Sequence, residues 1–227
     1  MGPRSLDDQF VGYRRRLIEQ IRRQGISDLE VLQIFDQVPR HIFLPQGVWP
    51  RAYEDAPIPI GYGQTASQPS LQALYLTLLK PTPDEKVLEI GTGSGYLTAL
   101  LGLMADRVYS VERVRELSAR ARSALDTLTL HNVALLVGDG TIGWRKYAPF
   151  DVIVVSAASP SVPQAILEQL ADPGRMLIPV GARDLQELVM VRKQDGEVTE
   201  EVVADAVTFV PLLGRYAWTP ESGEGGQ

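Results

Sequence analysis

The spacing of apolar residues divides the chain into two parts. In the first part, apolar residues recur every three or four positions, which predicts amphipathic helices over residues 6–24, 27–38 and 70–80. Six prolines and several glycines interrupt residues 39–70, so we expect a long connection there with little regular structure. Residues 1–80 are therefore predicted to form an appendage of helices and loops.

The second part alternates between short apolar runs and amphipathic segments. Strands are predicted over Lys86–Ile90, Arg107–Val111, Val133–Val137, Asp151–Ser156 and Met176–Val180, and helices over Ser94–Ala105, Arg115–Leu128 and Val162–Ala171. This alternation is typical of an α/β fold with a doubly wound, mostly parallel sheet and helices on both faces. An antiparallel hairpin of Glu187–Arg192 and Val198–Val203 follows, and Val207–Leu212 is a candidate last strand.

Three serines precede predicted helices at positions that suit an N-cap. Ser27 and Glu30 form a capping-box pattern ahead of the second helix. Ser67 and Ser161 stand shortly before the third helix and the last one. A side-chain oxygen at such a position accepts a hydrogen bond from an N–H group of the first turn.

Composition narrows the range of functions. The chain has 227 residues, with 22 Lys and Arg against 28 Asp and Glu, a formal net charge of −6 and a pI near 5.0. Nucleic-acid binding usually leaves a basic footprint, so we expect no nucleic-acid partner, and we interpret the arginines of the first helix as a solvated face. With no cysteine and only His41 and His131, we expect neither a metal site nor a cysteine nucleophile.

Neither a membrane span nor a signal peptide is predicted. One of the longest strongly apolar stretches, Leu97–Ala105, is about half as long as a membrane-spanning helix. Residues 1–10 contain Arg4, Asp7 and Asp8 and have no apolar core. We therefore expect a cytoplasmic protein without a membrane partner, and a disordered tail at residues 219–227, which are rich in Gly, Glu, Ser and Pro.

The strongest local signal joins the first predicted strand of the second part to the helix after it. Gly91, Gly93 and Gly95 follow the strand directly, and Glu89 precedes them. Glycines allow a tight turn and a close approach to a ligand, and a helix N-terminus offers unpaired N–H groups. The G-x-G-x-G spacing differs from the G-x-G-x-x-G of dinucleotide-binding folds. It resembles motif I of S-adenosylmethionine-dependent methyltransferases.

Two acidic residues follow the next two strands. Glu112 ends the second strand, 21 residues after Gly91, where a carboxylate can accept hydrogen bonds from both hydroxyls of a ribose. Asp139 lies between Gly138 and Gly140 after the third strand, in a loop beside the same pocket, where it suits the amino group of an adenine. Together with the glycines, these residues predict a nucleoside site.

Over most of residues 6–218 the chain resembles the protein-L-isoaspartate O-methyltransferases. The matching segments are Val38–Phe43, Ala52–Asp55, Gly63–Ser67 with its Gln-Thr-x-Ser sequence, Gly138–Gly140, Pro149–Asp151 leading to Val180-Gly181, and Phe209–Leu212. The Gln-Thr-x-Ser element joined to motif I is far more specific than the glycine loop alone. The resemblance implies a Rossmann-like class I methyltransferase domain of about seven strands over residues 81–214, followed by a tail at 215–227.

The resemblance also implies a function and the residues that perform it. The family uses S-adenosylmethionine to methylate the α-carboxylate of L-isoaspartyl residues in damaged proteins and peptides, and the ester then closes to a succinimide whose hydrolysis restores some normal aspartyl linkage. By the family pattern, Ser67 is the active-site residue. The expected cofactor-binding residues are Gln64, Thr65, Ala66, Ser67, Glu89, Gly91, Gly93, Glu112, Arg113, Asp139 and Gly140. The expected substrate-binding residues are Ser67, Ile60, Val210 and Leu212, and a monomer is expected.

This chemistry agrees with the scarcity of histidine and cysteine. An α-carboxyl group has a pKa of about 3.5 and is ionised at neutral pH, so the acceptor needs no general base. Catalysis is expected to come mainly from alignment and partial desolvation. We expect Ser67 to donate a hydrogen bond to the substrate carboxylate and not to act as a nucleophile, because no base is evident that would activate it.

Three other functions stay open from the residues alone. One is a methyltransferase for a different acceptor, although Ser156–Pro160 after the fourth strand has neither the carboxylate nor the aromatic ring typical of enzymes that methylate amino groups of nucleic acids. Another is a non-catalytic module that binds S-adenosylmethionine. The third is a nicotinamide oxidoreductase, which the glycine spacing disfavours.

Overall fold

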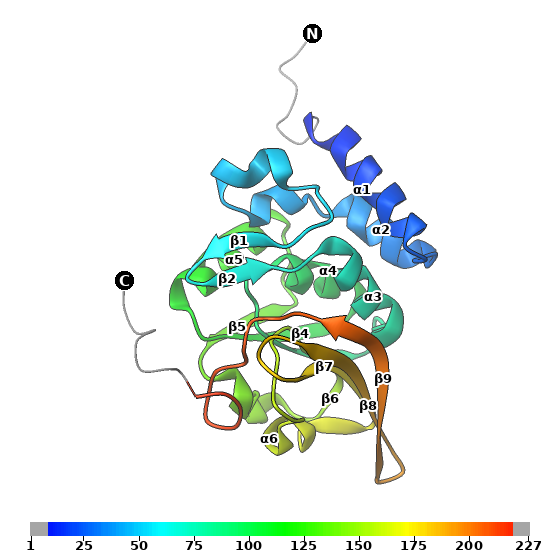
Figure 1. The fold of residues 1–227 in the computed structure, drawn as a ribbon, viewed down its shortest axis with the longest axis vertical. Coiled ribbons are helices and arrows are strands. Elements are labelled where there is room, and N and C mark those ends of the chain that lie inside the picture. Colours follow the sequence, from blue (N-terminus) through cyan, green and yellow to red (C-terminus); the bar gives the residue numbers. More distant parts are fainter. Residues whose placement is uncertain (1–8, 220–227) are drawn as a thin grey trace.

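Seven strands form one sheet in the computed structural model, which describes residues 9–219 (Figure 1). In spatial order they are β5 (Val133–Val137), β4 (Arg107–Glu112), β3 (Lys86–Ile90), β6 (Phe150–Val155), β7 (Leu170–Gly181), β8 (Gln186–Gln194) and β9 (Glu197–Val207). The first five in this order are parallel, and β8 and β9 are added antiparallel. The predicted doubly wound, mostly parallel sheet is confirmed.

The strand order reverses between β3 and β6, which lie side by side at the centre of the sheet. On one side of this pair the chain proceeds from β3 to β4 and β5, and on the other from β6 to β7. In open α/β sheets, the ligand site lies outside the carboxyl ends of the strands at such a reversal. The topology therefore directs attention to the loops after β3, β4, β5 and β6.

Two hydrophobic cores cover the two faces of the sheet. Helices on one face are α1 (Val11–Arg23), α2 (Leu29–Gln37), α3 (Pro69–Leu79), α4 (Tyr96–Met104) and α5 (Arg115–Thr127). The other face packs against α6 (Gln164–Leu167) and the segment between β5 and β6. Val87 and Leu88 are neighbours on β3 and enter opposite cores. The parallel strands are apolar along nearly their whole length because both of their faces are buried.

The connection between α2 and α3 contains more regular structure than its prolines and glycines predict. It holds two short 3-10 helices, Arg40–Phe43 and Gln46–Arg51, and a hairpin of β1 (Ile58–Gly61) and β2 (Gln64–Ala66). The prediction of little regular structure was wrong because Ile58 and Ile60 alternate with exposed residues and bury their side chains in the core. The hairpin brings the Gln-Thr-x-Ser segment to the carboxyl end of the sheet (Figure 1).

The three predicted N-caps are wrong. Asp28 caps α2 instead of Ser27, since its Oδ1 accepts hydrogen bonds from the N–H groups of Glu30 at 3.1 Å and Val31 at 3.3 Å. At α3 the residue before the first turn is Gln68, and at α6 it is Pro163, so neither Ser67 nor Ser161 is a cap. Proline at the first position of α3 has no N–H to satisfy.

Two predicted elements near the C-terminus are also wrong. The helix expected over residues 162–171 is only α6, because β7 already begins at Leu170, which pairs with Phe150 in the sheet. The strand expected over 207–212 does not form, since β9 ends at Val207 and the chain then crosses the carboxyl ends of the strands. There the N–H of Leu212 donates to the carbonyl of Ala158 at 2.7 Å.

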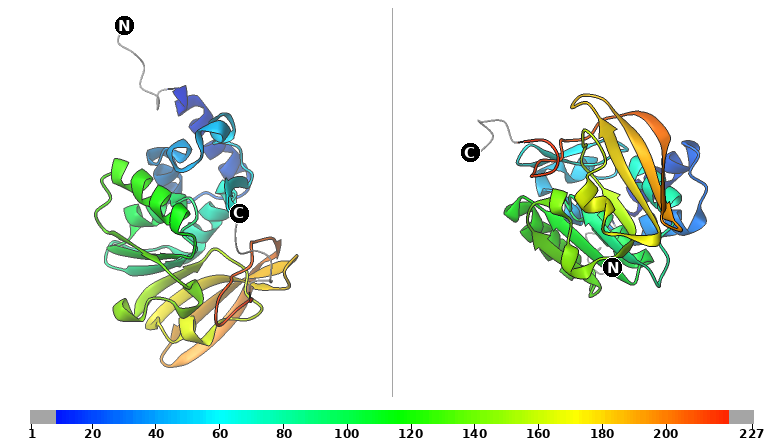
Figure 2. Two further views of the ribbon diagram at one scale, coloured as in Figure 1. Left: turned by 90° about the vertical axis from the view of Figure 1, so that its left-hand side faces the viewer. Right: turned by 90° about the horizontal axis from the view of Figure 1, so that it is seen from below.

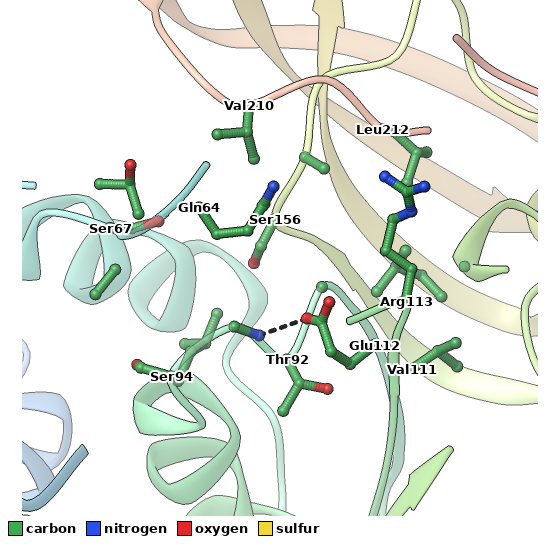
Figure 3. Close-up of a pocket in the computed structure, with 18 of the residues that line it drawn as sticks. Gln64, Ser67, Thr92, Ser94, Val111, Glu112, Arg113, Ser156, Val210 and Leu212 are labelled. Atoms are coloured by element: carbon green, nitrogen blue, oxygen red, sulfur yellow. Dashed lines mark hydrogen bonds between the residues drawn. The ribbon is translucent and has the colours of Figure 1, made fainter. Parts of the chain in front are cut away.

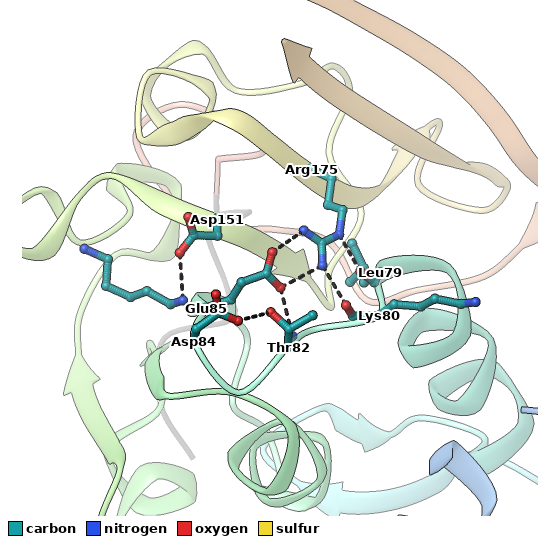
Figure 4. Close-up of polar contacts among 8 residues, drawn as sticks. Leu79, Lys80, Thr82, Asp84, Glu85, Asp151 and Arg175 are labelled. Atoms are coloured by element: carbon teal, nitrogen blue, oxygen red, sulfur yellow. Dashed lines mark hydrogen bonds and ion pairs between the residues drawn. The ribbon is translucent and has the colours of Figure 1, made fainter. Parts of the chain in front are cut away.

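An ion-pair network joins the end of α3 to the sheet (Figure 4). Arg175 of β7 donates to both carboxylate oxygens of Glu85, at 2.7 and 2.8 Å, and to the carbonyls of Leu79 and Lys80. Partial burial opposes ionisation of Glu85, but hydrogen bonds from Arg175 and Thr82 outweigh it and lower the pKa of this carboxyl group. The network fixes the linker between the appendage and β3.

α1 and the turn between β8 and β9 lie at opposite ends of the molecule (Figure 2). Within residues 9–219, no helix is long and apolar enough to cross a membrane. The disordered tail expected at 219–227 lies outside the described residues, apart from Thr219.

Candidate active site

The glycine loop between β3 and α4 has a backbone that suits glycine. Gly91, Gly93 and Gly95 all have positive φ angles, of 93°, 53° and 86°. A Cβ atom on Gly95 would lie 2.8 Å from the Cβ of Ala121, so only glycine lets α4 start this close to α5. Gly91 and Gly93 line a pocket at the carboxyl ends of β3 and β4, as the sequence predicts.

Glu112 lies at the end of β4 and faces the glycine loop. Its Oε2 accepts a hydrogen bond from the N–H of Gly93 at 2.8 Å (Figure 3). Its Oε1 accepts one from the N–H of Val114 at 2.9 Å. A carboxylate can accept about four hydrogen bonds, so each oxygen keeps capacity for another donor. The two backbone bonds hold the carboxylate at the pocket wall, ready for a ligand with two neighbouring hydroxyls.

Glu89 lies behind the loop and does not contribute to the pocket wall. The side chain is fully buried, and its Oε2 accepts hydrogen bonds from the hydroxyls of Thr98 at 2.5 Å and Ser110 at 2.6 Å. Burial raises the pKa of Glu89 to about 7, although the two hydroxyls favour the charged form. Ser110 is also hydrogen-bonded to Thr92 of the loop, at 2.5 Å, so Glu89 supports the loop through this chain of hydroxyls.

Asp139 anchors the C-terminal segment. Its Oδ1 accepts from the N–H and the hydroxyl of Thr141, at 2.9 and 2.6 Å, and its Oδ2 accepts from the N–H of Arg215 at 2.8 Å. Gly140, the next residue, lines the pocket, whereas Asp139 itself does not. In this structure the Asp139 carboxylate therefore holds the segment that closes one side of the pocket.

The pocket combines three parts of the chain that are far apart in sequence. The hairpin supplies Gln64–Ser67, the sheet supplies the loops after β3, β4, β5 and β6, and the C-terminal segment supplies Val210–Leu213. In Figure 3, Ser67 and Gln64 lie on one side of the pocket and Glu112 and Arg113 on the other. The pocket holds about 770 Å³ of space, part of it open to solvent.

A second, larger groove meets this pocket at Ser67. It runs between α3 and the end of β9, holds about 1600 Å³, and shares Thr65, Ser67, Ser156 and Val210 with the first pocket. Ser156 follows β6 directly, so it stands at the reversal of strand order between β3 and β6. We did not predict it as a site residue, although its position after the fourth parallel strand is a signal that the sequence contains.

Most of the predicted site residues come together here. Those that line the first pocket are Gln64, Thr65, Ala66, Ser67, Gly91, Gly93, Glu112, Arg113, Gly140, Val210 and Leu212. Glu89 and Asp139 lie behind it, and Ile60 lines a separate groove between the 3-10 helices and α5. The fold thus gathers residues 64–67 and 210–213 around the glycine loop, which sequence spacing alone does not predict.

Arg40 is a further residue that we did not predict for the site. Its side chain is fully buried, and it donates to the carbonyls of Ala52 at 2.8 Å, Glu54 at 3.3 Å and Ser67 at 3.0 Å. Burial lowers the pKa of Arg40 to about 10, so the guanidinium stays charged at neutral pH. Arg40 thereby holds the backbone at Ser67 against that of Ala52 and Glu54.

The one carboxylate that lines the pocket is Glu112, which already accepts two backbone hydrogen bonds, and no histidine lines it. His41 is buried elsewhere, where its Nδ1 lies 2.9 Å from the hydroxyl of Tyr53, and His131 is exposed. Within residues 9–219, no group of three or more acidic or histidine side chains could hold a metal ion. The arrangement suits a reaction that aligns two reactants and moves no proton.

Comparison with known proteins decides the family. The profile of the protein-L-isoaspartate(D-aspartate) O-methyltransferase family matches residues 13–217. A protein-L-isoaspartate O-methyltransferase of Geobacter metallireducens is 49% identical over 210 residues, which cover 92% of this chain and 97% of the relative. The chain belongs to this family.

Solved structures agree with that placement. A protein-L-isoaspartate O-methyltransferase superimposes with a TM-score of 0.79 at 29% identity, covering 90% of this chain and 67% of the other. A relative from Plasmodium falciparum, in complex with S-adenosyl-L-homocysteine, also gives a TM-score of 0.79, at 26% identity and with 88% and 98% covered. The predicted family, fold and enzyme class, a methyltransferase that uses S-adenosylmethionine, are confirmed.

The residues that line the pocket of this chain fit that cofactor. The three glycines leave the loop backbone open to a ligand, and the spare lone pairs of Glu112 match the two hydroxyls of a ribose. Ile90, Val111 and Leu212 give the pocket an apolar side that suits a flat adenine ring. No charged group in this part of the wall would disfavour a nucleoside.

Proposed function

We propose that this chain transfers the methyl group of S-adenosylmethionine to the α-carboxylate of L-isoaspartyl residues in proteins and peptides, the step that starts their repair. The observation that supports this best is the position of Ser67. It lies where a pocket that fits the cofactor opens into a groove with room for a polypeptide. A small-molecule enzyme needs no such second groove.

The cofactor is assigned to the first pocket. Glu112 binds the ribose, the backbone of Gly91 and Gly93 approaches the amino-acid end, and Gly140 and Leu212 flank the adenine. Gln64, Thr65, Ala66 and Arg113 complete the wall. Glu89 and Asp139 act indirectly, by holding the glycine loop and the C-terminal segment in place.

The damaged polypeptide is assigned to the second groove, which leads to Ser67 past Val210. Its walls are mostly small or apolar, including Leu71, Ala204 and Val207, so a main chain can lie close to them. The hydroxyl of Ser67 donates a hydrogen bond to the α-carboxylate. Ile60 does not line this groove but a separate one, and it belongs to the strand that pairs with Gln64–Ala66.

The chemistry requires alignment only. When bound, the cofactor supplies a methyl group on a sulfonium sulfur; a carboxylate oxygen forms the new C–O bond while the electron pair of the S–C bond goes to sulfur. An α-carboxyl group is already ionised at neutral pH, because its pKa is about 3.5. Ser67 fixes the direction of the carboxylate, and the apolar walls remove water from it.

We further propose that residues 1–80 act as an appendage that closes over the methyltransferase domain of residues 81–214, and that the enzyme works as a cytoplasmic monomer without a nucleic-acid partner. A net charge of −6 disfavours an interaction with nucleic acid.

Replacement of Ser67 tests this assignment. In Ser67→Ala, kcat/KM for an isoaspartyl peptide is expected to fall about 10- to 100-fold, because one hydrogen bond to a charged group is lost. The affinity for S-adenosylhomocysteine, measured by calorimetry, is expected to change less than about threefold, since Glu112 and the glycine loop are intact. Unchanged kcat/KM in Ser67→Ala would remove Ser67 from the acceptor site.

A further inference from the structure

A small cavity adjoins Ser67 at the junction of the two larger pockets. It is lined by Ser67, Leu71, Gln72, Tyr75, Leu97, Ser156 and Phe209. Ser67 and Ser156 line all three spaces, whereas Tyr75 lines only the small one. It is the smallest of the three spaces and has room for about one water molecule. The cavity therefore adjoins the point where the two larger pockets meet, and its size suits a single small polar group.

Two side chains of α3 bring unpaired polar atoms to this cavity. The side-chain oxygen of Gln72 and the hydroxyl of Tyr75 are buried and have no hydrogen-bond partner within the described part of the chain. Gln72 is 7% exposed and Tyr75 is 2% exposed. The two residues are three positions apart on the helix and therefore share one face. Buried polar groups are nearly always paired, so these two indicate a partner that occupies the cavity.

The chemistry of the cavity selects an acceptor of hydrogen bonds. Burial raises the pKa of Tyr75 well above its usual value, so its hydroxyl stays neutral and can donate. Ser67 and Ser156 add two more hydroxyls. The unpaired atom of Gln72 is its side-chain oxygen, which accepts, so Gln72 donates here only with its amide turned by 180°, which exchanges the NH₂ group and the oxygen. No charged side chain lines the cavity. Such a set of neutral donors is complementary to a carboxylate oxygen, which only accepts.

Packing holds these donors in place. The ring of Tyr75 stacks on that of Phe209, with centroids 6.1 Å apart and an interplanar angle of 29°. The N–H of Phe209 in turn donates to the side chain of Gln186 at 2.8 Å. The Tyr75 hydroxyl is thus fixed by the segment that also forms the wall of the substrate groove.

We propose that this cavity is the subsite for the oxygen of the acceptor carboxylate that does not react, and that Gln72 and Tyr75 donate hydrogen bonds to it. The inference rests on the proposed function and adds two residues to it. The other oxygen stays turned toward the cofactor pocket and forms the bond to the methyl group. The held oxygen becomes the carbonyl oxygen of the ester, which still accepts hydrogen bonds, so the contact persists through the reaction.

Tyr75→Phe separates this role from a structural one. It removes a single buried hydroxyl that has no partner in the described residues, so the melting temperature is expected to stay the same or to rise. For an isoaspartyl peptide, kcat/KM is expected to fall about 10-fold, the value of one lost hydrogen bond to a charged group. The Kd of the peptide, measured with S-adenosylhomocysteine bound, is expected to rise by a similar factor.

The chain offers a matched control on the same helix. Thr77 also has a buried hydroxyl without a partner in the described residues, but it lines neither the cavity nor the two pockets beside it. Thr77→Val is expected to shift the melting temperature as Tyr75→Phe does and to leave kcat/KM within about twofold. Gln72→Glu, which places a like charge beside the carboxylate, is expected to weaken peptide binding more than Tyr75→Phe.

The experiments distinguish failure of the subsite proposal from failure of the proposed function. If the wild-type enzyme does not methylate the isoaspartyl peptide, the proposed function fails. If the wild type methylates it while Tyr75→Phe keeps kcat/KM and peptide Kd within about twofold, the function stands and the subsite proposal is overturned, because the cavity then holds only structural water. Loss of activity with the melting temperature retained supports the subsite.

Discussion

Glu89 and Glu112 are carboxylates on neighbouring strands, yet their surroundings give them different tasks. Glu112 is held at the pocket wall by two backbone N–H groups, those of Gly93 and Val114. Glu89 is fully buried behind the loop, and burial raises its pKa to about 7. By the family pattern, both were expected to be cofactor-binding residues. Only the three-dimensional structure distinguishes the residue at the wall from the residue behind it.

The raised pKa of Glu89 makes the stability of the fold depend on pH. The folded protein holds this proton up to about pH 7, whereas the unfolded chain releases it near the ordinary value of 4.5. The contribution of Glu89 to the free energy of unfolding is therefore largest below about pH 4.5, falls as the pH rises to about 7 and then stays constant. Between about pH 4.5 and pH 7, the free energy of unfolding is predicted to fall by about 3 kcal/mol because of Glu89.

Glu89→Gln tests this prediction, because glutamine has no proton to lose. In urea unfolding, the stability of the variant relative to wild type is expected to increase from about pH 5 to about pH 8. Because variant and wild type are compared at the same pH, the contributions of other titrating groups cancel in the difference. A stability difference that is the same at both pH values would show that Glu89 does not titrate in this range.

At the scale of elements, the site depends on two segments whose structure was predicted wrongly from the sequence. The hairpin of β1 and β2 lies in a stretch that was expected to be irregular, and residues 210–213 lie in or next to a stretch that was expected to form a strand. Strands β3 and β5 match their predicted bounds because apolar runs between turn residues have few alternatives. The irregular segments are fixed by long-range contacts, such as those from Arg40 to Ser67 and from Asp139 to Arg215.

The network of Arg175 is expected to be important for attachment of the appendage. Arg175→Met leaves Glu85 and the carbonyls of Leu79 and Lys80 without their donor, so the free energy of unfolding is expected to fall by about 2 kcal/mol. Arg175 and Glu85 are 24% and 19% exposed, so solvent screens the pair only in part. Urea unfolding gives the measurement.

Arg192 provides the matched control. It forms an ion pair with Glu201 at 2.8 Å on the same sheet, but the two side chains are 50% and 63% exposed. Exposed pairs contribute little, so Arg192→Met is expected to change stability by less than about 0.5 kcal/mol. Equal effects of the two substitutions would mean that the Arg175 network does not hold the linker.

At the scale of the whole molecule, the fold class, the parallel sheet and most pocket residues could be predicted from the sequence, because strand-and-helix alternation and the glycine motif are local signals. The substrate groove could not be predicted from the sequence. It lies between α3 and the end of β9, about 130 residues apart in the chain. Gln72 and Tyr75 gain their proposed roles only from that juxtaposition.

The most direct test uses two peptides that are identical except for one linkage, isoaspartyl in the first and normal aspartyl in the second. Each is incubated with the enzyme and methyl-labelled S-adenosylmethionine, and base-labile label is measured over time. Because the isoaspartyl residue carries a free α-carboxylate, kcat/KM is expected to be at least about 100-fold higher for the isoaspartyl peptide than for the normal aspartyl peptide. Equal labelling of both peptides, or no label on either while the cofactor binds, would contradict the proposed function.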